Sequence, residues 1–288
     1  MITHPHVKLN FGLSVLRRRE DGYHDLETLF VPYHGLSDTL EIVTGEDWSE
    51  TAASLFVRYA SSEVAQAITP DGAVMVTIVR RGGVDWDPLK DLTVRAYALL
   101  SADYRLPPVK IYLEKNAPVG AGLGGGSSDA AYALRMLSDL GGLGLSDAAL
   151  CAYAARLGSD CAFFVYDAPM LGKGRGEILT PFDLDLSAYE IRLVVPEGIS
   201  VSTAEAYRGI VPRERVPGLG DCSLQEALAR PVNEWRGVLV NDFETTVFAA
   251  HPELAALKQQ LYDQGATYAA MSGSGSVLFG LFAKKQPL

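Results

Sequence analysis

The sequence predicts a globular protein of about two domains that combines β-strands with α-helices. Its 288 residues are about twice the length of a common domain of roughly 150 residues. Apolar residues make up 48% of the chain and charged residues 21%, which is ordinary for a folded protein with a sizeable core. Stretches that alternate with period two occur beside stretches with helical spacing, so we expect both kinds of element.

The charge balance and the cysteines limit the classes of function. Lysine and arginine number 25 against 35 aspartates and glutamates, a net charge of −10, whereas a nucleic-acid binder needs a basic surface. The three cysteines, Cys151, Cys161 and Cys222, have no metal-ligand spacing, which favours reduced thiols in the cytoplasm. Neither a secretory signal nor a membrane-spanning stretch is recognisable. We therefore expect a cytoplasmic protein with no nucleic-acid or membrane partner.

The predicted elements of the first half begin with a strand over residues 7–15, where apolar and polar side chains alternate. Lys8 and Asn10 share one face of this strand, roughly 7 Å apart. Further strands are predicted over residues 39–43, 55–59, 74–79 and 109–113. Helices are predicted over residues 91–102, from about 127 to 140, and from a cap at Ser146 to Gly158. Asp160 follows, at the start of the apolar run 161–165.

After about residue 168 the sequence becomes richer in turn-forming residues. We place the domain boundary there, which gives domains 1–168 and 169–288. A turn-rich stretch over residues 172–181 precedes a strand over 191–195 and a proline- and glycine-bearing connection over 211–220. Helical segments then continue to about Gln264, and the chain closes with residues 268–271, a Ser/Gly turn and a strand over 277–282.

The most informative stretch is a glycine-rich turn between a strand and a helix. Glycines lack the Cβ atoms that would block a ligand, so the backbone amides can converge on an anion. The positive end of the following helix and two serine hydroxyls would add to this site, which suits a triphosphate. The residues we assign to it are Pro118, Gly120, Gly122, Leu123, Gly124, Gly125, Gly126, Ser127 and Ser128.

Three other interpretations of this turn are weaker. A Walker A loop would need a lysine before Ser127, and none is present. Gly120, Gly122 and Gly125 fit G-x-G-x-x-G, but no suitably placed strand ending in an acidic residue follows, so a nicotinamide-dependent dehydrogenase is a remote alternative. A loop that is glycine-rich only for tight helix packing stays open as the structural alternative.

In this context the sequence resembles the superfamily of galactokinase, homoserine kinase, mevalonate kinase and phosphomevalonate kinase, the GHMP kinases. Residues 118–130 match the phosphate-binding motif and residues 271–275 the third motif of that superfamily. Other matching stretches are residues 7–10, 21–24, 27–30, 157–160 and 174–179, in the expected order. The Asp21-Gly22-Tyr23-His24 stretch narrows the resemblance to the branch that acts on a cytidyl diphosphate of methylerythritol.

The resemblance implies an α+β fold of two domains, an N-terminal ATP-binding domain and a ferredoxin-like C-terminal domain, with the active site in the cleft between them. It further implies transfer of the γ-phosphoryl group of ATP to the 2-hydroxyl of 4-diphosphocytidyl-2-C-methyl-D-erythritol, in the non-mevalonate pathway to isoprenoids. The alternatives are a homoserine or mevalonate type of GHMP kinase, or a nucleotide-binding module that has lost catalysis.

The resemblance assigns the catalytic pair to Lys8 and Asp160. A carboxylate can orient the acceptor hydroxyl and take its proton, while a lysine beside it keeps the carboxylate ionised and offsets charge on the transferred group. By pattern alone, Lys8 would be a solvated strand residue and Asp160 a turn residue. Whether Asp160 acts as a base or as a positioner stays open.

Six residues are assigned to the substrate through the same resemblance, namely Asn10, Tyr23, His24, Phe30, Thr203 and Tyr207. An imidazole can pair with the polar edge of cytosine while an aromatic ring stacks on its face. His24 and Tyr23 are expected in these roles, with Tyr207 as a second ring and Phe30 as a wall of the sugar pocket. Two interpretations stay open for Thr203 and the 273–275 turn. They line the regions that bind the acceptor substrate and the phosphates, or they serve only as connections between strands.

Magnesium is expected with the ATP, because hard cations bridge phosphate oxygens, and Ser128 is a candidate contact to it. We expect a monomer or a weak homodimer. Two positions depart from the superfamily pattern: Val7 stands where alanine is common, and Asp91 stands where asparagine is common near the adenine site. The second departure leaves the adenine contacts open. Residues 241–244 are interpreted as a helix-capping feature.

Overall fold

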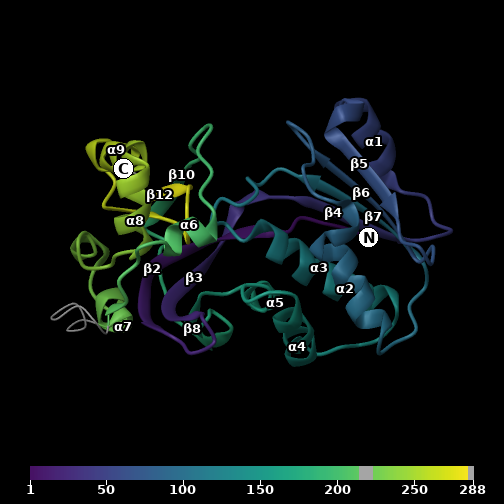
Figure 1. Cartoon of the computed structure of the whole chain (residues 1–288), viewed down its shortest axis with the longest axis horizontal. Coiled ribbons are helices and arrows are strands. Elements are labelled where there is room, and N and C mark those ends of the chain that lie inside the picture. Colours follow the sequence, from purple (N-terminus) through teal and green to yellow (C-terminus); the bar gives the residue numbers. More distant parts are fainter. Residues whose placement is uncertain (214–222, 285–288) are drawn as a thin grey trace. The chain divides into compact units, whose positions relative to one another are not determined.

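The computed structural model describes residues 1–213 and 223–284, and the chain forms two compact units (Figure 1). The first unit contains Met1–Val7, Pro32–Val119 and Gly124–Asp167. The second contains Lys8–Val31, Gly120–Leu123 and Ala168–Leu288. The mixture of helices and sheets is the expected α+β architecture.

The two units differ from the predicted domains 1–168 and 169–288 mainly in Lys8–Val31 and Gly120–Leu123, which belong to the second unit. The reason is strand pairing. β3 (His24–Ser37) pairs with β8 (Met170–Gly174), with Leu26 opposite Gly174 and Phe30 opposite Met170. Period-two alternation identifies a strand but not its partner, so the sequence did not indicate that an early hairpin joins strands that follow residue 168.

A five-stranded mixed sheet forms the centre of the first unit. Its strands, in spatial order, are β1 (Ile2–Thr3), β4 (Thr39–Thr44), β7 (Val109–Lys115), β6 (Val74–Arg80) and β5 (Val64–Ile68). β6 and β7 are parallel, with Val74 opposite Val109, and the other pairs are antiparallel. The predicted strands over residues 39–43, 74–79 and 109–113 are confirmed.

The helices of the first unit are α1 (Glu50–Arg58), α2 (Leu92–Ser101), α3 (Gly125–Leu140), α4 (Asp147–Leu157) and α5 (Phe163–Tyr166), with short 3₁₀ turns at Ser61–Glu63 and Pro88–Lys90. The prediction of a strand over residues 55–59 is wrong, because that segment lies in α1. Ser49 starts this helix by accepting a hydrogen bond from the Ala52 amide. The predicted cap of Ser146 on α4 is confirmed.

A buried ion network fixes the segment before the glycine-rich turn. The Lys115 ammonium at the end of β7 contacts the carboxylates of Asp38 and Asp129. Asp38 also accepts hydrogen bonds from the backbone amides of Asn116 and Ala117. Asp129 belongs to the first turns of α3, so the network ties the end of a central strand to the start of the helix on both sides of the turn.

The second unit contains two antiparallel arrangements of strands. β2 (His6–Arg18) and β3 form a hairpin. β8 pairs with β3, and β9 (Ile178–Pro181) pairs with β8, so the four-stranded sheet has the order β2, β3, β8, β9. A separate three-stranded sheet has the order β10 (Tyr189–Val194), β12 (Leu278–Ala283), β11 (Tyr268–Met271). β8 and β9 occupy the stretch 172–181, which was predicted only as turn-rich; Gly172, Gly174 and Gly176 concealed the strand pattern.

The helices of the second unit are α6 (Thr203–Tyr207), α7 (Leu224–Leu228), α8 (Phe243–Ala250) and α9 (Pro252–Asp263), with a 3₁₀ turn at Val232–Glu234. The apolar faces of α8 and α9 pack with the three-stranded sheet, where Val247, Leu254 and Leu278 are buried together. Most of the predicted connection over residues 211–220 lies outside the described residues.

Within residues 1–213 and 223–284, no helix is both long enough and apolar enough to cross a lipid bilayer. Cys151 and Cys161 are both free thiols; Cys222 lies outside the described residues.

Candidate active site

Lys8 stands at the centre of a buried polar cluster on β2. Only 4% of the residue is exposed. Its ammonium donates to Asn10 Oδ1 at 2.5 Å and to the carbonyl oxygen of Gly122 at 2.9 Å, and it lies 5.4 Å from the centre of the Phe30 ring. The expectation of a solvated lysine, drawn from the strand pattern alone, is therefore wrong: the cation is held in one place by oriented acceptors.

Asn10 connects this lysine to the neighbouring strand. Its Nδ2 donates to Thr28 Oγ1 at 3.0 Å, and the Thr28 hydroxyl in turn donates to the Gly12 carbonyl at 2.6 Å. Because Asn10 and Thr28 are buried, the chain of hydrogen bonds leaves Asn10 Oδ1 facing the lysine. A buried amide with all its polar atoms engaged is a rigid support for a charged group.

The glycine-rich turn meets the same lysine through its middle residues. Leu123 accepts a hydrogen bond from the Lys8 amide at 2.9 Å, and the Ala121 carbonyl accepts one from Val277 at 3.3 Å. Gly122 has φ +81°, and a Cβ there would lie 2.0 Å from the Ser272 carbonyl oxygen. Glycine is required at this position on both counts.

The Ser/Gly turn near the C-terminus completes the cluster. Ser272 Oγ donates a hydrogen bond to the Gly122 carbonyl at 3.1 Å. The backbone amide of Asn10 donates one to Ser272 Oγ at 3.3 Å. A Cβ on Gly273 would lie 3.3 Å from the Lys8 ammonium nitrogen. The 273–275 turn is therefore more than a hairpin connection, because it packs directly against the lysine.

Asn241 anchors this turn, a role that the sequence analysis missed. Its side-chain amide donates to the carbonyls of Met271 and Gly273, both at 2.8 Å. Its Oδ1 also accepts a hydrogen bond from the Phe243 amide at the start of α8, whereas Asp242, the residue that directly precedes the helix, forms no side-chain cap. No local pattern signals a contact with residues 30 positions later.

In the first unit the glycine-rich turn runs into α3, which begins at Gly125 rather than at about Ser127. Gly124 precedes it with φ +71°, a backbone conformation that glycine adopts freely. Ser128 is fully buried, and its hydroxyl has no hydrogen-bond partner among the described residues. The free amides of the first turn and this hydroxyl are the donors expected of an anion site at a helix start.

Asp160 lies in the turn that follows α4, close to the same helix start. The neighbouring thiol of Cys161 forms a hydrogen bond with Ser127, and burial raises the pKa of that thiol to about 11. A Cβ on Gly158 would lie 4.0 Å from Ser127 Oγ. The turn carrying Asp160 and the first turn of α3 therefore pack together within the first unit.

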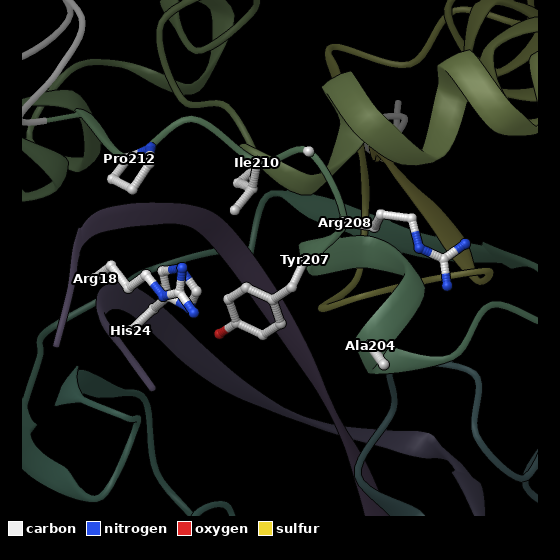
Figure 2. Close-up of a pocket in the computed structure, with 8 residues that line it drawn as sticks. Arg18, His24, Ala204, Tyr207, Arg208, Ile210 and Pro212 are labelled. Atoms are coloured by element: carbon white, nitrogen blue, oxygen red, sulfur yellow. The ribbon is translucent and has the colours of Figure 1, made fainter. Parts of the chain in front are cut away.

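A pocket of about 450 Å³ opens beside the hairpin end of β2 and β3. Figure 2 shows the side chains of His24, Tyr207 and Arg18 gathered there. The rings of His24 and Tyr207 stack with centres 4.7 Å apart and planes inclined by 19°. Burial and the nearby Arg18 guanidinium lower the pKa of His24, which favours the neutral imidazole. The remaining lining residues are Ala204, Arg208, Gly209, Ile210 and Pro212.

The stacked pair differs from an open clamp. A base between two rings needs two stacking layers of about 3.5 Å each, which exceeds the 4.7 Å between His24 and Tyr207. In this arrangement a base can stack only on an outer face or meet the imidazole with its polar edge. The Tyr207 ring also packs against the Phe243 ring in a T-shaped arrangement, with the ring centres 4.8 Å apart.

Two further predicted substrate residues lie at the surface. Tyr23 is 56% exposed, and the Arg175 guanidinium lies 5.0 Å over its ring. Thr203 begins α6, where Ser202 caps the helix, and it is exposed. Neither residue lines the described pocket, whose α6 contributions are Ala204 and Tyr207.

Asp91, the position that departs from the superfamily pattern, has a structural role. Its carboxylate accepts hydrogen bonds from the amide and the hydroxyl of Thr93 at 2.9 and 2.7 Å, which caps α2. It also accepts one from Trp86 Nε1 at 3.2 Å. The cap of α2 needs one side-chain oxygen, which aspartate or asparagine supplies, whereas the Trp86 contact uses the second carboxylate oxygen, which asparagine lacks.

Comparison with known families agrees with the two-unit architecture. Residues 91–168 match the family described as GHMP kinases N terminal domain, and residues 224–288 match the one described as GHMP kinases C terminal. A protein of Bacteroides thetaiotaomicron named 4-diphosphocytidyl-2-C-methyl-D-erythritol kinase is 43% identical, covering 98% of this chain and 92% of its own length. One of the same name from Azobacteroides pseudotrichonymphae is 44% identical, covering 99% and 94%.

This chain is also similar to solved structures of GHMP kinases. A crystal structure of 4-(cytidine 5'-diphospho)-2C-methyl-D-erythritol kinase superposes with a TM-score of 0.71 and 32% sequence identity, covering 98% of this chain and 90% of the other. A crystal structure of mevalonate kinase superposes with a TM-score of 0.63 but only 10% identity, over 98% and 91%. That second likeness shows a shared fold alone.

Proposed function

We propose that this chain, which belongs to the GHMP kinases and within them to the 4-diphosphocytidyl-2-C-methyl-D-erythritol kinase family, transfers the γ-phosphoryl group of ATP to the 2-hydroxyl of that cytidyl substrate. The reaction is a step of the non-mevalonate route to isoprenoid precursors. The observation that carries the proposal is the likeness over nearly the full chain to relatives that bear this name, at 43% and 44% identity.

The phosphate site is proposed at the glycine-rich turn and the start of α3. The turn is tied to β2 through Leu123 and Gly122, and the helix start is held by the buried carboxylate of Asp129 on Lys115. A loop fixed at both ends keeps its amides oriented without reorganisation when the triphosphate binds. The Ser128 hydroxyl, which has no hydrogen-bond partner in the part of the chain that the structure describes, is a hard oxygen donor that fits contact with Mg²⁺, which would neutralise phosphate charge when bound.

Lys8 and Asp160 are proposed as the catalytic pair. Phosphoryl transfer proceeds through a loose transition state, so positioned charges matter more than covalent chemistry. Two acceptors of the Lys8 ammonium are neutral oxygens, Asn10 Oδ1 and the Gly122 carbonyl, and they help to fix its position. The carboxylate of Asp160 would orient the acceptor hydroxyl and accept its proton as the new bond to phosphorus forms.

The cytosine is proposed to bind in the pocket of His24 and Tyr207. A neutral imidazole offers one donor and one acceptor, which suits the mixed polar edge of cytosine, and the lowered pKa of His24 favours that form. The cationic side chain of Arg18 at the same pocket suits the diphosphate that follows the cytidine, whereas the Arg208 guanidinium points away from His24 and Tyr207 (Figure 2). Homoserine and mevalonate have no base that would use such a pocket.

The proposal is tested by measuring ADP release from ATP with three acceptors separately: the cytidyl diphosphate of methylerythritol, homoserine and mevalonate. We expect release that depends on the cytidyl substrate and is at background with the other two. Release with homoserine or mevalonate alone would support another GHMP kinase. Binding of ATP with no transfer to any acceptor would support a module that has lost catalysis.

We also infer that the enzyme works in the cytoplasm as a monomer or a weak homodimer. The free thiols of Cys151 and Cys161 support a reducing compartment. Sedimentation at several protein concentrations measures the oligomeric state.

A further inference from the structure

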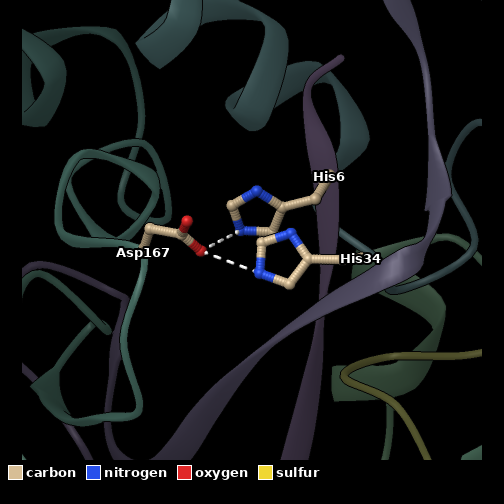
Figure 3. A group of neighbouring side chains, drawn as sticks. All are labelled: His6, His34 and Asp167. Atoms are coloured by element: carbon tan, nitrogen blue, oxygen red, sulfur yellow. Dashed lines mark ion pairs between the residues drawn. The ribbon is translucent and has the colours of Figure 1, made fainter.

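Two histidines and an aspartate, none of them assigned to the reaction, gather in the first unit. Figure 3 shows the imidazoles of His6 and His34 turned toward the carboxylate of Asp167. His6 begins β2, His34 lies in β3, and Asp167 ends α5. One ligand atom from each residue lies within 4.8 Å of the other two.

The distances from each histidine to the carboxylate match those between neighbouring ligands of a metal ion. His6 Nε2 and His34 Nε2 lie 3.3 and 3.1 Å from the same carboxylate oxygen, Asp167 Oδ1. Zinc binds imidazole nitrogen and carboxylate oxygen at about 2.0–2.2 Å in a tetrahedral arrangement, which places neighbouring ligand atoms about 3.3–3.5 Å apart. The two distances are close to that value without any rearrangement.

His6 provides a second and independent indication of a ligand. The residue is 1% exposed, and its Nε2 has no hydrogen-bond partner among the described residues although Asp167 Oδ1 is only 3.3 Å away. A buried polar atom without a partner carries a free-energy cost that folded proteins usually avoid. A metal ion shared with the carboxylate would satisfy this nitrogen, since metal coordination needs no proton between the two atoms.

The surroundings hold the His6 ring in the orientation that a ligand needs. Its other nitrogen, Nδ1, lies 2.9 Å from the Tyr132 hydroxyl, the type of outer contact that fixes metal-binding histidines. The edge of Phe164 packs on the ring at 5.4 Å between centres.

We propose that His6, His34 and Asp167 form a binding site for one divalent transition-metal ion, with Zn²⁺ as the best match. Two imidazoles and one carboxylate favour zinc, cobalt or nickel over magnesium, which prefers an all-oxygen shell. Three protein ligands leave at least one position for water, and His34 and Asp167 are partly exposed, so the ion can enter from solvent. The proposal does not rest on the proposed kinase activity.

The alternative is a carboxylate that bridges two imidazoles through hydrogen bonds alone. That arrangement explains the 3.1 Å contact of His34, but it leaves His6 Nε2 unsatisfied. This alternative also predicts that added metal ions do not bind specifically to these three residues. The two interpretations therefore separate in a titration.

Occupancy is expected to stabilise the fold, because the three ligands come from segments remote in sequence. Each lies within three residues of a point where the chain passes between the two units, at Val7–Lys8, Val31–Pro32 and Asp167–Ala168. An ion that binds only the folded chain shifts the unfolding equilibrium by mass action.

The test is a titration of the full chain, free of any affinity tag and treated with chelator, with Co²⁺ and then Zn²⁺. We expect one equivalent of Co²⁺ to give the visible absorption of a low-coordinate site, Zn²⁺ to displace it, and millimolar Mg²⁺ to leave it unchanged. Zinc should also raise the thermal unfolding temperature in a concentration-dependent manner.

Two variants and two controls make the test specific. Asp167→Asn keeps a residue that tolerates the left-handed backbone at φ 47°, and His34→Gln changes an exposed side chain, so both should fold. Each is expected to weaken metal binding about tenfold or more. His4→Ala and His251→Ala should bind as the parent does. Absence of the cobalt band, or equal binding by all four variants, would overturn the proposal.

Discussion

The neighbours of Lys8 determine its burial and the position of its ammonium group. An exposed lysine on a strand is ordinary, but this one is buried and restrained by Asn10 and the Gly122 carbonyl. The position of Lys8 in the alternation predicted its face of the strand but not its burial, because the covering residues come from two distant glycine-rich turns. The match of residues 7–10 to a kinase motif was the signal that identified it.

Gly122 can be tested against a matched control. Gly120 and Gly122 both have positive φ, but a Cβ on Gly120 meets nothing within 4 Å, whereas one on Gly122 lies 2.0 Å from the Ser272 carbonyl oxygen. Each alanine variant carries a backbone cost of about 1–2 kcal/mol. We expect Gly122→Ala to lose more unfolding free energy and more turnover than Gly120→Ala. Denaturant titration and ADP release measure both; equal losses would contradict the role of the close approach.

His24 is expected to act on binding and little on the chemical step. His24→Ala should raise KM for the cytidyl substrate about tenfold or more, since a polar edge of the base left without its hydrogen-bond partner costs roughly 1–3 kcal/mol, while kcat changes little. His4→Ala, at an exposed histidine outside the pocket, is the control. An unchanged KM in His24→Ala would remove this residue from the cytosine site.

At the scale of elements, the ion network around Lys115 holds the strand and helix that flank the glycine-rich turn. Burial by itself would lower the pKa of Lys115, but the carboxylates of Asp129 and Asp38 raise it overall. Burial raises the pKa of Asp129 well above its usual value. Removal of the cation would leave two buried carboxylates facing each other without compensation.

Lys115→Met should therefore reduce the unfolding free energy by about 3–5 kcal/mol, the usual cost of breaking a buried ion pair. The control is Lys110→Met on the same strand, whose ammonium only reaches the Asp47 carbonyl at an exposed position, and it should change stability little. Urea denaturation of both variants provides the comparison. A loss in Lys115→Met no larger than in the control would show that the network does not stabilise the fold.

The elements that the sequence predicted are those whose pattern is local. β2, β4, β6, β7 and α2 follow from alternation or helical spacing within their own residues. α1 was mistaken for a strand because a short apolar run does not distinguish the two, and the cap at Ser49 was overlooked. β8 was missed because its glycines carry no apolar side chains, and its stability comes from pairing with β3.

For the whole molecule, the sequence predicted the α+β class and the superfamily but not the composition of the two units. The N-terminal hairpin belongs to the second unit, since strand partners are decided by tertiary packing rather than by alternation. The residues that surround Lys8 could be named from motifs. Asn241 and Ser272 were not assigned to the site, because their contacts depend on how distant turns come together.

The proposed reaction requires a cation and a carboxylate that come from different units, Lys8 and Asp160. The most direct measurement is single-turnover transfer from labelled ATP to the cytidyl substrate by the parent enzyme, Lys8→Ala and Asp160→Asn, with ATP binding measured in parallel. We expect both variants to fold and bind ATP but to transfer the phosphoryl group about 10²–10⁴-fold more slowly. Transfer at close to the parent rate by either variant would contradict the assignment.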